Sequence, residues 1–377
     1  MNCAIVKFLL DHGTMRLPPI FFLNEPHYHA VRVGEMNRFR GAVLAADGAQ
    51  VERVAVYRAG EMVAEAVVNV ACPELAWLSL PRASQCRFVF ETRLEKGTQY
   101  ELHGSLEDGT EIPLFLFDTG FVERQGHRLD ELWRCVLSKP VPPPEIVAIT
   151  QGVGDVDSYR ASIVSGLLKA ERLLADSGVR SRSIQSILDI GCGTGRLLVG
   201  WHCDDPGRRL VGVDINADLI GWARDHLASV AEWSTSAISP PLALPHASFD
   251  LIQLVSVFTH LPIPCQRAWL REIRRLLRPD GHAIISLQGE VYATVLLDPA
   301  RQGQYQREGY VEMPAGAEGG NAFATFHSEP FARDLFRDFS RVTFYPRGVV
   351  GPVARLFPLA SLQDVYVLSN FSASDFH

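Results

Sequence analysis

Alternating polar and apolar residues dominate the first 140 positions of the chain. In one run, Tyr100 and Leu102 flank Glu101, which is the period of a half-buried strand. The same pattern predicts strands at residues 39–44, 51–57, 62–68, 99–106 and 112–117. The pair Asp108-Gly109 separates the last two and favours a hairpin turn, because both residues tolerate positive φ. Short strands without a convincing helix predict an immunoglobulin-like β-sandwich.

Four prolines are concentrated between Ser138 and Pro144. Proline at this density opposes regular secondary structure and favours a stiff, extended linker. We therefore place a domain boundary here. The predicted organisation is a β-sandwich domain at residues 1–140, a proline-rich linker at 141–147 and a second domain at 148–377.

The apolar spacing changes after the linker. Residues 161–174 have the period of an amphipathic helix, with Ile163, Leu167 and Leu174 on one face. Strands are then predicted at 184–190, 210–214, 249–255 and 282–287, with helices starting at 195, 217 and 266 between them. Apolar strands that alternate with amphipathic helices are typical of a parallel α/β sheet covered on both faces. Segments 341–345 and 364–368 are expected to complete the sheet.

Composition agrees with two folded domains in 377 residues, since 47% of the residues are hydrophobic and 21% are charged. The net charge of −7 argues against nucleic acid as the main partner, because phosphate contacts need a basic surface. A local basic face remains open, and the densest candidate consists of Arg267, Arg271, Arg274, Arg275 and Arg278. Apolar residues at helical spacing share that segment, so these arginines also fit the solvated side of an amphipathic helix.

The cysteines and the chain start bear on the compartment. Seven scattered cysteines without a CxxC pair suggest neither a disulfide framework nor a zinc site, so no metal is expected. The short apolar stretch at residues 1–10 is not followed by a cleavage site, and no apolar run reaches the length of a membrane span. We expect a reduced, cytoplasmic protein.

A glycine-rich turn is the strongest chemical signal. A strand carrying Asp189 leads into Gly191, Gly193 and Gly195, after which a helix begins. Glycines let the backbone turn sharply and let a ligand approach the bare main chain. The free N–H groups at the start of the helix favour a carboxylate or phosphate. A tight strand-to-helix turn also favours glycine, so the loop alone does not specify a ligand.

The end of the next strand narrows the choice of ligand. Asp214 lies nineteen residues beyond Gly195 and can accept hydrogen bonds from both hydroxyls of a ribose. The alternative is that Asp214 only caps the helix expected near Ala217. A nucleoside cofactor is therefore indicated, but which one depends on the glycines. Dinucleotide loops read GxGxxG, whereas this loop reads GxGxG, with Arg196 where a small residue is needed.

This spacing, with Asp189 before it, resembles motif I of the class I S-adenosylmethionine-dependent methyltransferases. The resemblance covers about 230 residues. Further stretches resemble, in chain order, the family's adenine-side loop, its fourth strand, the following helix and the turn into the fifth strand. They are residues 240–245, 248–252, 256–261, 269–273 and 277–281. Residues 325–328 and 363–368 resemble the start of the last helix and the antiparallel final strand. The resemblance implies a Rossmann-like, seven-stranded sheet and S-adenosylmethionine as the cofactor.

The resemblance also implies roles for individual residues. Gly191, Gly193 and Gly195 would lie against the methionine part of the cofactor, and Asp189 would lie near its amino group. Tyr159, in the helix before motif I, would cover the methionine end; a packing role in the core or against the linker is the alternative.

The ribose and adenine would bind beyond the next two strands. Asp214 would hold the ribose and Ile215 would pack on the adenine. Many members of the family place an acidic residue in the adenine-side loop, but residues 235–239 contain none. Adenine recognition is therefore assigned to backbone groups around Ile238.

His260 is the candidate general base for transfer to a hydroxyl. It follows the fourth strand, at the carboxyl edge where open α/β sheets bind ligands, and imidazole suits proton transfer near neutrality. A capping or packing role in its loop is the alternative. His327 and Gln288 are weaker candidates on the same rim.

A long segment between Gly289 and Phe326 is expected to be a loop that covers the acceptor site, with a plain surface insertion as the alternative. The expected activity is O-methylation of a small-molecule or glycan acceptor. Two alternatives from other classes remain: a non-catalytic cofactor-binding scaffold, and an NAD-dependent oxidoreductase, which the glycine spacing disfavours. The oligomeric state is not predicted.

Overall fold

The structure is a computed structural model that describes residues 20–25, 31–45, 48–73, 75, 80, 82–151, 156–314, 323–348, 354–355 and 363–370. The chain start and residues 315–322, within the expected acceptor cover, lie outside this set. The chain divides into two compact units. Unit 1 comprises Met1–His127, Thr294–Leu296 and Val349–Ala360, and unit 2 comprises Arg128–Ala293, Leu297–Gly348 and Ser361–His377.

The division at Arg128 differs from the predicted boundary, because a helix crosses the end of the first domain. Helix α2 (Thr119–Ser138) buries Leu129, Leu132 and Val136 at helical spacing, so the expectation of no helix in the first 140 residues is wrong. The proline-rich stretch is also shorter than predicted. Pro144 already opens helix α3 (Pro144–Gln151), as proline can because it fits the first helical turn.

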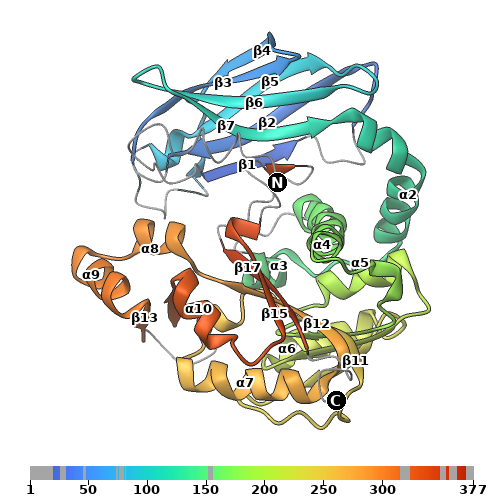
Figure 1. Ribbon diagram of the computed structural model, residues 1–377. Coiled ribbons are helices and arrows are strands. Elements are labelled where there is room, and N and C mark those ends of the chain that lie inside the picture. Colours follow the sequence, from blue (N-terminus) through green and yellow to red (C-terminus); the bar gives the residue numbers. More distant parts are fainter. Residues whose placement is uncertain are drawn as a thin grey trace. The chain divides into compact units, whose positions relative to one another are not determined.

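Unit 1 contains two antiparallel sheets (Figure 1). One has the order β1-β2-β5 and is formed by β1 (Ile20–Glu25), β2 (Met36–Leu44) and β5 (Arg87–Arg93). The other runs β7-β6-β3-β4 and is formed by β3 (Val51–Arg58), β4 (Glu61–Val67), β6 (Gln99–Leu106) and β7 (Glu111–Asp118). A short strand, β16 (Ala354–Arg355), adds to β7 in parallel, and a 3₁₀ turn, η3 (Ala83–Gln85), precedes β5.

Aromatic side chains pack the two sheets face to face. Phe21 of β1 stacks on Phe115 of β7 with ring centroids 6.0 Å apart, and Phe39 of β2 meets Phe117 of β7 edge-on at 5.8 Å. The strand orders correspond to strands A, B, E and G, F, C, C′ of an immunoglobulin-like sandwich. The strands predicted in this region are therefore present, in two sheets.

Unit 2 is an α/β domain. Besides α3 and the second half of α2, its helices are α4 (Val156–Asp176), α5 (Arg196–Asp204), α6 (Ala217–His226), α7 (Ile263–Leu276), α8 (Glu290–Leu296, whose last turn is assigned to unit 1), α9 (Pro299–Glu308) and α10 (Glu329–Leu335). Its strands are β8 (Ser186–Ile190), β9 (Arg209–Asp214), β10 (Glu232–Thr235), β11 (Phe249–Leu254), β12 (Leu277–Leu287), β13 (Tyr310–Met313), β14 (Ala324–His327), β15 (Arg341–Tyr345) and β17 (Asp364–Ser369). Three 3₁₀ turns, η4 (Ser181–Ser183), η5 (Phe258–His260) and η6 (Pro346–Gly348), complete it.

Seven strands form one sheet in the order β10-β9-β8-β11-β12-β17-β15. The first five are parallel, and β17 is antiparallel to both of its neighbours. Helices α5 and α6 connect strands that step toward β10, whereas α7 connects β11 to β12 in the opposite direction. Right-handed crossovers therefore place α7 on the opposite face from α5 and α6 (Figure 1). The α/β prediction is confirmed, including the antiparallel final strand.

The segment predicted as a long loop, residues 289–326, is largely structured in its described part. Helices α8 and α9 occupy its first half, and β13 pairs with β14 in a separate two-stranded sheet. Helix α9 escaped prediction because Tyr305 is its only buried residue, so it has no apolar period. Its capping residues were a usable signal: Asp298 accepts from the Arg301 N–H, and Gly309 ends the helix at φ 79°.

A disulfide joins Cys135 of α2 to Cys203 of α5, with Cα atoms 5.6 Å apart. The prediction of no disulfide is wrong because the two cysteines lie 68 positions apart, and spacing cannot show that they meet in space. Arg128 of α2 donates to Glu171 of α4 at 2.8 Å and to Asp204 of α5 at 2.6 Å beside it. The expectation of a reduced, cytoplasmic protein stays a prediction. None of the described helices is long and apolar enough to cross a membrane.

Removing this disulfide is expected to lower the free energy of unfolding by about 2–4 kcal/mol, because the crosslink restricts the unfolded chain over a long loop. Urea unfolding of the Cys135→Ser/Cys203→Ser double variant against the oxidised wild type measures the difference. Cys265→Ser, which removes a half-buried thiol outside the disulfide, is the control. A reduced wild type as stable as the oxidised one would show that the crosslink contributes nothing.

Candidate functional site

The glycine turn lies at the carboxyl edge of the sheet, where ligands bind in open α/β folds. Gly191, Gly193 and Gly195 all have left-handed backbone conformations, with φ of 72°, 55° and 83°. Space is also limiting. A Cβ on Gly191 would lie 2.4 Å from a methyl group of Val257, and one on Gly195 would lie 2.1 Å from the Trp233 ring. Glycine is therefore required for packing as well as for the turn.

Asp214 binds the glycine turn directly. One carboxylate oxygen accepts from the Gly193 N–H at 2.7 Å, and the other accepts from the Asn216 N–H at 2.8 Å. The cap of α6 is Asn216, whose side chain accepts from the N–H groups of Asp218 and Leu219. The interpretation of Asp214 as a helix cap is therefore wrong. Since a carboxylate has about four acceptor directions, roughly two remain for a ligand such as a ribose diol.

Asp189 lies beneath this turn and is 2% exposed. The pKa of its carboxyl is raised to about 7, mainly by burial, with Arg196 opposing the shift and the nearby Asp214 adding to it. A buried carboxylate at the end of β8 can pair with a cation that enters from the carboxyl edge.

The helices before β8 close over the glycine turn. The Tyr159 hydroxyl forms a hydrogen bond of 2.9 Å with the Thr194 hydroxyl, and Arg196 donates to the Ser162 carbonyl at 3.2 Å. Thr150 of α3 would contact a Cβ on Gly193 at 3.0 Å. Tyr159 therefore packs on the turn itself, which agrees with both of its predicted roles.

Two apolar side chains are exposed at the carboxyl edge of the sheet. Ile215 is 44% exposed and Val255 is 36% exposed, and they follow β9 and β11. Exposed apolar residues at this edge are suited to cover a flat apolar ring. Ile238 behaves differently. Its carbonyl accepts from the Trp269 indole at 2.9 Å and its side chain packs against the core, so that carbonyl already has a partner.

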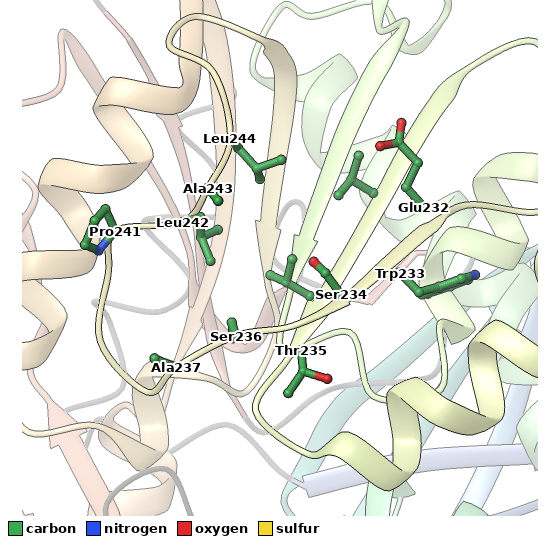
Figure 2. A pocket seen from close by; sticks show the side chains of 12 residues that line it. Glu232, Trp233, Ser234, Thr235, Ser236, Ala237, Pro241, Leu242, Ala243 and Leu244 are labelled. Atoms are coloured by element: carbon green, nitrogen blue, oxygen red, sulfur yellow. The ribbon is translucent and has the colours of Figure 1, made fainter.

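A pocket of about 470 Å³ runs along strand β10 (Figure 2). Its walls are Val211, Val213, the residues 232–237 and the residues 241–244. Thr235, Ser236 and Ala237 connect it to the loop predicted to face adenine. Trp233 points away from Leu242 and Leu244, in keeping with its packing against Gly195 (Figure 2). Neither the glycine turn nor Asp214 lines this pocket, so it adjoins the predicted cofactor site without including it.

His260 ends the turn η5, just beyond β11, and is half-buried. Its Nδ1 lies 2.8 Å from the Phe323 carbonyl oxygen. A carbonyl only accepts, so Nδ1 carries a proton. In the neutral form of the ring, the lone pair that can accept a proton is then on Nε2. Val257, three residues earlier, contacts Gly191. The structure thus brings the His260 loop against the glycine turn.

The two weaker candidates differ from His260 in environment. His327 is 1% exposed, and burial lowers the pKa of its imidazole to about 3. Such a ring is a poor base near neutral pH because its conjugate acid is too strong. Gln288 is also buried and lies next to His327, whose backbone N–H donates to the Gln288 carbonyl at 2.8 Å.

Sequence reasoning missed two other residues of this edge. Ser256 has a left-handed backbone with φ 61°, and its N–H donates to the Ser286 hydroxyl at 2.7 Å. Trp233 forms the wall against which Gly195 and Gly212 pack. No local pattern signals either role, since the partners of both residues are distant in the sequence.

Comparison with known proteins adds to this geometry. Residues 187–281 match the family described as "Methyltransferase domain". A malonyl-[acyl-carrier protein] O-methyltransferase of Hahella chejuensis is 37% identical over 102 residues, which cover 27% of this chain and 36% of the relative. One of Geobacter sulfurreducens is 31% identical over 144 residues, covering 38% of this chain and 52% of the relative. The chain thus spans about a third to a half of the length of these curated relatives.

Among solved structures, a SAM-dependent methyltransferase of Methanosarcina mazei is similar with a TM-score of 0.36 and 19% identity, covering 50% of this chain and 92% of the other. The family match lies on the strands β8 to β12 that carry the glycine turn, Asp214 and the His260 loop. Residues 187–281 therefore match a methyltransferase domain, and the sheet that carries them has the Rossmann-like order expected of the class I, S-adenosylmethionine-dependent methyltransferases.

Proposed function

We propose that the protein transfers the methyl group of S-adenosylmethionine to an oxygen atom of a small-molecule or glycan acceptor, with His260 as the general base. The observation that carries this proposal is the orientation of His260. Its Nδ1–H is committed to the Phe323 carbonyl, which leaves Nε2 to take a proton, in a loop that touches the glycine turn through Val257.

The reaction is an in-line displacement at the sulfonium methyl group. The acceptor oxygen forms a bond to the methyl carbon, the carbon–sulfur bond breaks, and S-adenosylhomocysteine leaves with the electron pair. The hydroxyl proton goes to Nε2 of His260. Because the leaving group is already good, the chain mainly has to orient the acceptor, remove its proton and exclude water.

The cofactor is proposed to bind at the carboxyl edge of the same sheet. Asp214 accepts from the ribose hydroxyls with the lone pairs that Gly193 and Asn216 leave free. Ile215 covers one side of the adenine, and backbone groups near Ile238 other than its carbonyl recognise the ring edge. The names of two relatives, both malonyl-[acyl-carrier protein] O-methyltransferases, support oxygen as the methylated atom.

Cofactor affinity is expected to depend on pH through Asp189. The proposal pairs this carboxylate with the cofactor's ammonium group, so binding needs the ionised form. Because the pKa of Asp189 in the free protein is raised to about 7, affinity falls as the pH drops through that value. The dissociation constant at pH 6 should be about tenfold higher than at pH 8.

Calorimetric titrations at several pH values measure this dependence. Asp189→Asn should bind more weakly and lose the dependence, while the exposed Asp225→Asn should behave like the wild type. If the wild-type affinity for the cofactor is constant between pH 6 and pH 8, Asp189 does not pair with the cofactor's ammonium group.

Transfer itself is tested by incubating the full chain with S-adenosylmethionine labelled in the methyl group and a panel of hydroxylated metabolites, oligosaccharides and acyl thioesters. The proposal expects label in at least one acceptor and stoichiometric S-adenosylhomocysteine. Cofactor binding without transfer to any acceptor would favour the scaffold alternative. Labelled product at nitrogen or carbon would contradict the assignment of oxygen.

A further inference from the structure

A buried hydrogen-bond chain lies behind the turn that presents His260. Its centre is Gln266 of α7, which has no exposed surface. The Gln266 amide nitrogen donates to the Phe258 carbonyl at 2.9 Å and to the Leu261 carbonyl at 2.8 Å. These two carbonyls bracket His260 in the chain, so one side chain fixes both ends of the turn.

His327 of β14 supports Gln266 in turn. Its Nε2 lies 2.9 Å from the Gln266 side-chain oxygen. Because the Gln266 amide nitrogen serves two carbonyls, its oxygen is an acceptor, and His327 Nε2 must carry the proton. Burial keeps the ring neutral, since the pKa of His327 is lowered to about 3. The donor in this bond therefore does not change across the pH range in which the protein would work.

The same segment binds the His260 turn from a second side. The Thr325 hydroxyl donates to the Leu261 carbonyl at 2.8 Å, and Phe323 accepts from His260 Nδ1. His327 is itself anchored, because its N–H donates to the Gln288 carbonyl at 2.8 Å and its carbonyl accepts from the Tyr305 hydroxyl at 3.0 Å. Residues 323–327 thus hold both the imidazole of His260 and the backbone that carries it.

We propose that His327 and Gln266 are positioning residues that fix the orientation of the His260 imidazole through the turn η5. This inference rests on the proposed function only for the role of His260 as a base. It also gives a reason for a neutral, buried histidine at the rim: His327 moves no proton and serves as a fixed donor. Loss of the orientation should slow transfer about 10–100-fold with little change in cofactor affinity, as expected for a displaced catalytic group.

The test uses nitrogen NMR of the full chain labelled with [¹⁵N]histidine, at about pH 8.5, where a free imidazole is neutral. The His260 signals are assigned by their loss in His260→Asn. In the wild type we expect one tautomer with a slowly exchanging Nδ1 proton. Gln266→Leu and His327→Phe should give an average of both tautomers with fast exchange. His327→Gln should restore the wild-type pattern, because its amide can donate to Gln266 from nearly the same place.

Gln253→Leu is the matched control. Gln253 is equally buried and accepts from the Trp201 indole at 2.8 Å, so its loss should lower the melting temperature while leaving the His260 signals unchanged. If Gln266→Leu fails to fold, the pair His327→Phe and His327→Gln decides the question. A folded Gln266→Leu or His327→Phe with wild-type His260 signals, or the same change in Gln253→Leu, would overturn the inference.

These outcomes are independent of the methyl acceptor. If the expected NMR changes are observed but no methyl group is transferred, the positioning network is supported and the proposed function is contradicted. If methyl groups are transferred but the His260 signals are unchanged in the folded Gln266 and His327 variants, the proposed function is supported and the positioning network is contradicted.

Discussion

Replacing His260 with alanine is expected to slow methyl transfer about 10²–10⁴-fold, the usual contribution of a positioned general base. Affinity for S-adenosylmethionine should stay nearly constant, because Nε2 of His260 is proposed to face the acceptor and its Nδ1 binds Phe323. Single-turnover rates with an acceptor from the transfer screen separate the chemical step from binding.

His226→Ala is the control for this experiment. His226 is an exposed histidine at the end of α6 whose Nδ1 also contacts a backbone carbonyl, that of Trp222, at 2.9 Å. Its loss should leave the rate unchanged. A His260→Ala protein that keeps more than about a third of wild-type turnover would remove His260 from the mechanism.

Gly195→Ala is expected to give the second large effect. The new Cβ would lie 2.1 Å from the Trp233 ring in a backbone with φ 83°, so the chain must relieve both a steric overlap and a left-handed conformation. Together these should lower the free energy of unfolding by about 2–5 kcal/mol. Cofactor affinity should fall more than about tenfold as the turn moves. Chemical denaturation and calorimetry measure the two effects.

Two variants separate the causes. Trp233→Leu in the Gly195→Ala chain should remove the overlap and recover part of the stability, while the cost of the positive φ remains. Gly221→Ala, in α6 with no atom within 4 Å of the new Cβ, should be neutral or stabilising. A Gly195→Ala protein with wild-type stability and affinity would show that the close packing at Trp233 is not required.

The elements that could be predicted are those whose pattern is local. The apolar strands β8, β9, β11 and β12 and the helices between them follow from periodicity, and the turn at Gly191 follows from its spacing. Helix α9 and strand β10 were missed because one is polar and the other is a short edge strand. Helix α2 follows directly on a run of predicted strands, which hides its helical spacing.

The candidate site was likewise predictable only where the sequence pattern is local. Asp214 and His260 could be proposed from the sequence because one ends a strand and the other lies just beyond one, and the structure adds the contacts that orient them. Gln266 and Trp233 could not be found, since their partners are backbone carbonyls and glycines that a side-chain pattern does not mark. The Cys135–Cys203 disulfide belongs to the same class, because nothing in the intervening 68 positions signals the pairing.

Calorimetric titration of the full chain with S-adenosylmethionine and, separately, with NAD tests the central claim most directly. The glycine spacing and the two free acceptor directions of Asp214 predict a micromolar dissociation constant for S-adenosylmethionine and far weaker binding of NAD. Asp214→Ala should cost about 1.5–3 kcal/mol of that affinity, the range for hydrogen bonds to a charged group. Tight binding of NAD with no heat from S-adenosylmethionine would contradict the account.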